Sequence, residues 1–177
     1  MMLGACLGTV TGLTAGSVHI FNHALAKGAL FLAVASFAMV AAGLRLDDLK
    51  GIGRRMPWTF GAFVVAGLSL IGIPGTAGFV SKWYLISAAM EFGAAGLPLV
   101  AVILVSSLMA VVYVWRIVEA AWFGGDADTP LPAVSVSPVL VAVAWLAALV
   151  NVYFGLVPEL PLSLSGIAAT ELLDHLP

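Results

Sequence analysis

Residues 57–85 read PWTFGAFVVAGLSLIGIPGTAGFVSKWYL and contain one charged side chain, Lys82. The stretch begins with Pro57, a residue that is favoured in the first turn of a helix. The apolar run is interrupted by Gly72-Ile73-Pro74-Gly75 and then resumes. Glycine and proline free backbone amides and carbonyls, which a membrane tolerates only where protein or a cavity covers them. The stretch therefore predicts membrane-spanning helix with a break inside it.

Uncharged stretches of this kind fill most of the chain. Residues 1–44 carry one formal charge, Lys27, and residues 92–115 and 129–158 carry none. Apolar runs of roughly 20 residues match the thickness of a bilayer core. Of the 177 residues, 62% are hydrophobic and 9% are charged, with a mean hydropathy of +1.13, whereas a soluble domain usually carries about 25% charged residues. The composition excludes a soluble enzyme, a nucleic-acid-binding protein and a disordered chain.

We predict an all-α fold, a polytopic transmembrane helical bundle of about five helices, one of them discontinuous. Residues 1–157 are expected to form one membrane domain, and residues 158–177 a short tail that is a candidate for an interfacial helix. Aromatic residues near several predicted helix ends are typical of the membrane–water interface. The five helices are expected at about residues 13–44, 57–72, 76–92, 97–123 and 133–157.

The most polar stretch is RLDDLKGIGRR, residues 45–55. Its Leu46, Leu49 and Ile52 recur every three residues, which favours a short helix at the membrane surface. A solvated loop is nevertheless the preferred interpretation, because runs of charge usually lie in water. The four basic residues favour a cytoplasmic location by the positive-inside rule.

Three ionisable residues, His19, His23 and Lys27, share one face of the first predicted helix. They span about 80° of arc and about 12 Å along the helix axis. Lys27 precedes Arg45 by 18 residues, about 27 Å of helix, so its amine cannot reach water on that side. A lysine near the bilayer centre costs about 2.5–3.5 kcal/mol on insertion scales. The column therefore predicts a proton or ion path that faces protein or a hydrated cavity.

Other roles remain open for the two histidines. Either one alone is more often a hydrogen-bonded packing residue than a functional one. A histidine pair at positions i and i+4 can also chelate a metal ion. No third ligand lies nearby in the sequence, so we predict no metal site.

The interruption at Gly72, Pro74, Gly75 and Gly78 precedes Lys82 by about one helical turn. Broken helices of this kind line cavities in transporters, and the lysine is too far from residue 91 to reach water with ease. We expect Lys82 to belong to the ion path. The Ser81 hydroxyl is a candidate hydrogen-bond partner for its amine, although a serine in a membrane helix usually bonds the backbone of its own helix. The alternative is a plain turn between two helices.

Arg116 lies three residues before Glu119 and is a further supporting candidate, either paired with this glutamate or extended toward the membrane surface. The sequence contains no phosphate-binding glycine loop, no HExxH or CxxC motif and no Ser/His/Asp nucleophile set. We therefore predict no catalytic residues and no cofactor, and only charge movement across the membrane is supported.

Three segments together resemble the antiporter-like membrane subunits, the family that joins proton-pumping subunits of respiratory complex I, membrane-bound hydrogenases and Mrp-type sodium/proton antiporters. They are HIFNHALAKGALFL at residues 19–32, RRMPWTFGAFVVAGLSLIGIPGTAGFVSKWYL at 54–85 and YVWRIVEAAWFG at 113–124. The resemblance covers about residues 10–125. The tail, with ATELL at 169–173, is more similar to the D-type subunit of Mrp antiporters than to the other members.

The resemblance implies roles for the matching positions. His19, His23 and Lys27 would belong to a polar axis that carries protons laterally through the membrane. Lys82 would be the charged residue of the discontinuous helix, and Arg116 matches a recurring arginine. Family members have about fourteen helices in two inverted repeats, so this chain is expected to be the C-terminal part of such a subunit, as a split subunit or a truncated remnant.

The leading hypothesis is a multi-pass subunit of the cell (inner) membrane that takes part in proton translocation, as in Mrp-type cation/proton antiporters. The equivalent subunit of complex I, an NADH-quinone oxidoreductase, or of a hydrogenase is the alternative. A non-conducting scaffold is a hypothesis of another class, and a solute transporter is disfavoured because it would need a second broken segment. The expected partners are the lipid bilayer, other membrane subunits including one that supplies the missing N-terminal helices, protons and, in an antiporter, sodium ions; no nucleic acid is expected.

Overall fold

The computed structural model describes residues 2–41, 43, 45–125 and 136–175. Within these residues the chain is helical and contains no β-strand, which confirms the predicted all-α bundle. The elements are α1 (Met2–Cys6), α2 (Val10–Ala38), α3 (Ile52–Arg55), α4 (Pro57–Ile71), α5 (Ala77–Met90), the 3₁₀ turn η1 (Gly93–Gly96), α6 (Leu97–Val118), the π-helical turn η2 (Glu119–Phe123), α7 (Pro138–Leu156) and α8 (Glu159–Asp174).

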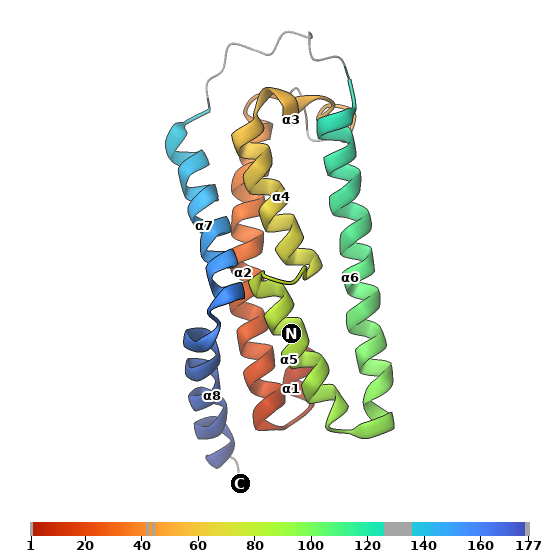
Figure 1. The fold of residues 1–177 in the computed structure, drawn as a ribbon, viewed down its shortest axis with the longest axis vertical. Coiled ribbons are helices and arrows are strands. Elements are labelled where there is room, and N and C mark those ends of the chain that lie inside the picture. Colours follow the sequence, from red (N-terminus) through yellow and green to blue (C-terminus); the bar gives the residue numbers. More distant parts are fainter. Residues whose placement is uncertain (1, 42, 44, 126–135, 176–177) are drawn as a thin grey trace.

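The long helix α2 forms the axis of the bundle, and α4 and α5 stand end to end beside it (Figure 1). The second and third predicted helices are thus the two halves of one discontinuous helix. At 15 residues, α4 covers about 22 Å, which is less than the roughly 30 Å of a hydrocarbon core. Both halves are therefore needed to cross a membrane.

Among the described residues, three segments are long and apolar enough to span a membrane by themselves: Val10–Ala38, Gly93–Phe123 and Pro138–Leu156. The first of them ends at Ala38, six residues before the predicted end, and begins after Thr9, whose hydroxyl accepts a hydrogen bond from the Gly12 amide at 3.0 Å. This side chain satisfies one of the amides that a helix start leaves unpaired. The predicted start of the last helix, residues 133–135, lies outside the described residues.

A second interruption separates α7 from α8 at Val157 and Pro158. The two helices follow each other alongside α2, much as α4 and α5 do (Figure 1). The sequence pattern identified only the break between α4 and α5 as an interruption of this kind. The signal at Pro158 was weaker, because a lone proline at a helix end also fits an ordinary stop.

Small side chains let the helices approach closely. Alanine, glycine and serine together fill most of the buried positions of α2, α4, α5 and α7, as is typical of helix contacts in membranes. Larger side chains fill the end of the bundle near α3, where Phe37, Leu49, Ile52, Phe60 and Phe63 form an apolar cluster.

The polar segment 45–55 forms turns followed by the short helix α3, so each of the two sequence interpretations describes part of it. Its Gly51 amide donates to the Ala120 carbonyl at 3.2 Å, and the Arg54 guanidinium donates to the carbonyls of Gly124 and Gly125 at 3.1 and 2.5 Å. These bonds fasten the segment to the end of α6.

An exposed ion pair joins Lys50 and Asp47 in the same segment, with 2.6 Å between Nζ and Oδ1. The hydrogen bond from the Lys50 ammonium lowers the pKa of the Asp47 carboxyl below its ordinary value. Exposed pairs of this kind contribute little to stability.

The break between α4 and α5 depends on glycines for two reasons. Gly72 and Gly75 have φ angles of +92° and +88°, in the left-handed region that residues with a Cβ rarely adopt. At Gly78 an added Cβ would lie 1.8 Å from the Ser69 carbonyl oxygen. The two halves can meet only because this position has no side chain.

We predict that Gly78→Ala lowers the free energy of unfolding by about 1–3 kcal/mol, the usual effect of overpacking. Gly28→Ala in α2 is the matched control, since a Cβ there meets nothing within 4 Å and alanine is favoured over glycine in a helix by about 0.5–1 kcal/mol. Thermal denaturation of both variants in detergent measures the difference. Equal melting temperatures for Gly78→Ala and Gly28→Ala would contradict the close contact between Gly78 and the Ser69 carbonyl.

Candidate functional site

Lys82 extends from α5 back to the end of α4. Its Nζ donates to the backbone carbonyls of Leu70 and Ile71 at 2.9 and 2.8 Å and to Ser107 Oγ of α6 at 2.8 Å. The two carbonyls belong to the last turn of α4, where carbonyl oxygens have no amide of the same helix as hydrogen-bond donor. This end of α4 also carries the negative end of the helix dipole. An ammonium has three donors, and here each has an acceptor. In its charged form Lys82 thus has an acceptor for each of its donors.

Gly72 gives this lysine its path. A Cβ at Gly72 would lie 2.9 Å from Lys82 Cδ and 3.4 Å from its Nζ. Gly72 therefore allows the backbone to change direction and also leaves room for the Lys82 side chain, which bonds to the last carbonyls of α4.

His19 lies next to this centre and contacts α5. Its Nδ1 is 2.9 Å from Ser81 Oγ, and the Ser81 hydroxyl donates to the Gly78 carbonyl at 3.1 Å. The Ser81 hydroxyl thus bonds the backbone of its own helix, as serines in membrane helices usually do, and His19, and not the Lys82 amine. The hydroxyl has a single proton and two acceptors within reach, the Gly78 carbonyl and His19 Nδ1, so the direction of its bond with His19 depends on the tautomer of the imidazole.

The structure separates Lys27 from the two histidines of the column predicted on α2. The ring centroids of His19 and His23 are 5.7 Å apart, whereas Lys27 is exposed and has no hydrogen bond or ion pair with the described residues. The structure brings the two histidines to Lys82 and leaves Lys27 on the surface. Within the same residues no group of three His, Cys, Asp or Glu side chains could hold a metal ion.

A cavity of about 10 Å³ lies between the histidines and the lysine. His19 and Lys82 also border a second cavity, of about 150 Å³, between α1, α2, α5 and α6. The small cavity is lined by His19, Asn22, His23, Ala26, Ser69, Leu70, Gly78, Ser81 and Lys82.

Sequence reasoning missed three buried polar residues around the break. Asn22 Nδ2 donates to the backbone carbonyl of Ala77 at 2.7 Å. Asn151 Nδ2 donates to the backbone carbonyl of Asn22 at 3.4 Å. Ser69 donates from its hydroxyl to Asn151 Oδ1 and accepts from the Gly78 amide. Their signal was a neutral polar side chain inside an apolar helix, which is weaker than a charge but has the same physical meaning.

Arg116 lies far from this centre, near the C-terminal end of α6. It is exposed and forms no ion pair with Glu119. Both residues border a surface pocket of about 370 Å³ together with Lys50. The structure does not place Arg116 with the histidines and Lys82.

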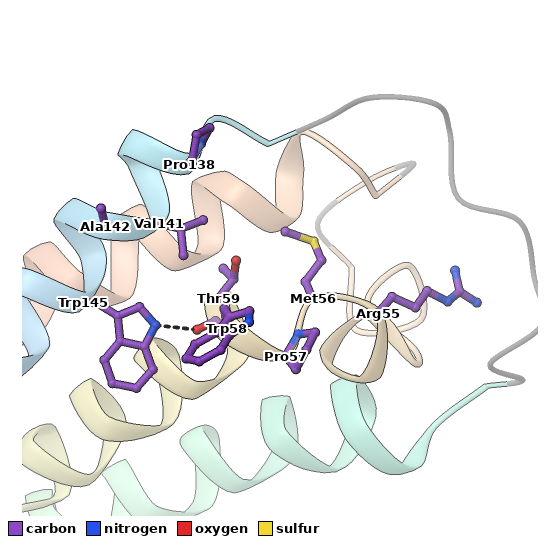
Figure 2. Close-up of a pocket in the computed structure, with 9 residues that line it drawn as sticks. All are labelled: Arg55, Met56, Pro57, Trp58, Thr59, Pro138, Val141, Ala142 and Trp145. Carbon is purple, nitrogen blue, oxygen red and sulfur yellow. Dashed lines mark hydrogen bonds between the residues drawn. The ribbon is translucent and has the colours of Figure 1, made fainter.

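A wider, mostly apolar pocket of about 440 Å³ lies where α4 begins beside α7 (Figure 2). Trp145 Nε1 donates to the Trp58 carbonyl at 2.9 Å there, and the Arg55 side chain points away from the other lining residues. The pocket shares no residue with the cavity at Lys82.

Comparison with known proteins points to one family. The model described as NADH:quinone oxidoreductase/Mrp antiporter, TM, matches residues 1–110. NADH-quinone oxidoreductase subunit N of Desulforudis audaxviator is 44% identical over 109 residues, which are 62% of this chain and 21% of that protein. The chain thus spans about a fifth of the length of this relative.

Two solved structures share the fold. A chain of the Mrp complex from Dietzia sp. DQ12-45-1b superposes with a TM-score of 0.83 at 29% identity, over 97% of this chain and 40% of the other. A chain of respiratory complex I from Thermus thermophilus, solved with bound aureothin, superposes with a TM-score of 0.68 at 29% identity, over 89% and 35%. With its apolar helices and this family match, the chain is a multi-pass membrane protein that belongs to the NADH:quinone oxidoreductase/Mrp antiporter family.

Proposed function

We propose that this chain is a membrane subunit that takes part in proton translocation in the cell (inner) membrane, as in a Mrp-type cation/proton antiporter. The observation that carries the proposal is the Lys82 ammonium, held by three acceptors at a helix break inside the bundle. A charge at such a position is expensive to keep and is usually functional.

Lys82 is proposed to load and release the transported proton. In the loaded state its three N–H groups bond to α4 and Ser107. After release the neutral amine has two N–H donors left, so one acceptor is freed and the break can rearrange. In the tautomer that donates from Nδ1 to Ser81, His19 offers Nε2 as the neighbouring proton acceptor, and His23 is proposed to extend the path along α2. Lys27 is proposed to continue this path at the exposed face of α2.

The proposed partners follow from the relatives. We infer that the chain works among other membrane subunits, including one that supplies helices equivalent to the part of the relatives that this chain does not span. Sodium as the counter-ion belongs to the Mrp-type assignment. The second candidate is the equivalent proton-pumping subunit of complex I, which the similarity to subunit N favours; a hydrogenase-type assembly remains the third.

We expect Lys82→Ala to abolish proton flux through proteoliposomes that contain the complex carrying this chain, and Lys27→Ala to do the same if Lys27 continues the path. Lys50→Ala is the matched control, because this lysine is exposed and its ion pair with Asp47 lies outside the apolar helices. Flux is measured with a pH-sensitive dye after an imposed gradient. Unchanged flux in the Lys27/Lys82 double variant, with the complex intact, would favour a non-conducting scaffold and overturn the proposal.

We expect Ser107→Ala to reduce flux by roughly tenfold to a hundredfold, because it removes one of three hydrogen bonds to a charged group, each worth about 1.5–3 kcal/mol. Ser87→Ala is the control, since this exposed hydroxyl bonds only to the Trp83 carbonyl of its own helix. The same liposome assay compares the two. Equal flux in Ser107→Ala and Ser87→Ala would show that the bond from Lys82 to Ser107 does not contribute to transport.

A further inference from the structure

Asn22 has one polar atom that the fold leaves without a partner. Its side chain is 1% exposed, and Nδ2 donates to the Ala77 carbonyl at 2.7 Å. Because a carbonyl can only accept, the nitrogen must face Ala77, which fixes the orientation of the amide. Oδ1 then has no hydrogen-bond partner among the described residues. A buried oxygen of this kind costs about 1–3 kcal/mol if it stays unpaired.

The same side chain lines the cavity of about 10 Å³ between the histidines and Lys82. This volume is close to the roughly 10–15 Å³ that a single water molecule needs, and a buried water requires two to four polar partners. The cavity wall offers His19, His23, Ser69 and Ser81 in addition to Asn22. The site is therefore polar enough and of the right size for one water molecule.

We propose that Asn22 binds a single water molecule in this cavity through Oδ1, and that this water joins the histidines to Lys82 in one hydrogen-bonded path when the Lys82 ammonium exchanges one of its three acceptors for the water. The inference rests on the function proposed above. The water donates one proton to Oδ1, which fixes its orientation and leaves its other hydrogen and its lone pairs for the path. During transfer it accepts a proton on one side and gives one up on the other, so its composition does not change. Asn22 is a positioning residue, because it acts through the water.

A metal cation does not suit the same cavity. Lys82 lines it, and its ammonium would repel a second positive charge in a medium of low dielectric constant. No carboxylate lines the cavity to offset that repulsion.

The first test is a high-resolution cryo-EM map of the complex that carries this chain, for the wild type and for Asn22→Leu. Leucine has a similar size but no acceptor. We expect a water peak about 2.7–3.2 Å from Asn22 Oδ1 in the wild type and no peak in the variant. An empty cavity in the wild type would overturn the water site whatever the flux assay shows, so this failure is separate from a failure of the proposed function.

The second test is proton flux in Asn22→Leu and Ala26→Val. Asn22→Leu also removes the bond to Ala77, whereas Ala26→Val adds methyl groups at the cavity wall and leaves that bond in place. We expect both to lose at least tenfold in flux. Ser36→Ala is the control and should keep wild-type flux, because this buried hydroxyl of α2 bonds only to the Leu32 carbonyl. Wild-type flux in a variant whose map has lost the water would overturn the positioning role.

Discussion

The rest of this bundle depends on one set of hydrogen bonds, from the Lys82 ammonium to the last backbone carbonyls of α4. A helix that ends inside a membrane leaves carbonyls without partners, and a lysine inside a membrane has donors without acceptors; each is costly alone. Here the ammonium of Lys82 bonds to the carbonyls of Leu70 and Ile71. The unpaired carbonyls at the break therefore need the lysine as a donor, and the lysine needs these carbonyls as acceptors. A scaffold would have no reason to keep this arrangement, since an unbroken apolar helix would satisfy the same backbone groups without any charge.

The start of α5 is satisfied in a different way, by neutral side chains. Ser69 accepts from the Gly78 amide, and Asn22 donates to the Ala77 carbonyl. Asn151 of α7 binds both Ser69 and the Asn22 backbone, so three neighbouring helices hold the second half of the broken helix in place. One side of the break thus depends on a group that can change its charge, and the other on groups that cannot. Loss of a proton from Lys82 would perturb the contacts of α4 while α5 keeps its anchors.

The sequence was sufficient for the features that are local. A glycine–proline interruption in an uncharged run predicts a broken helix wherever it occurs, and Lys82 stands out because no other charge is near it in the sequence. The histidine spacing predicted a shared face of α2, and the family resemblance predicted the fold that the structural comparison confirms. The partners of Lys82 could not be predicted, because two of them are backbone carbonyls, which every residue has. The exposure of Lys27 could not be predicted either, since helical periodicity places residues on a common face but does not say where along its length that face is covered. The contact between His19 and Ser81 joins residues that are 62 positions apart, and nothing in either local sequence specifies it.

The size of a cavity is a poor guide to this site. The apolar pocket beside Trp58 and Trp145 has a volume of about 440 Å³, whereas the cavity at Lys82 has about 10 Å³. A binding site for an organic ligand needs volume, because affinity for such a ligand grows from buried surface. A proton needs none; it needs donors and acceptors within hydrogen-bond distance of one another and exclusion of bulk water, which would let it escape. The wall of the small cavity contains two histidines, two serines, an asparagine and a lysine, which are the kinds of side chain that the proposed proton path requires. The wide pocket is mostly apolar and shares none of these residues, so it has no continuous hydrogen-bonded path to offer.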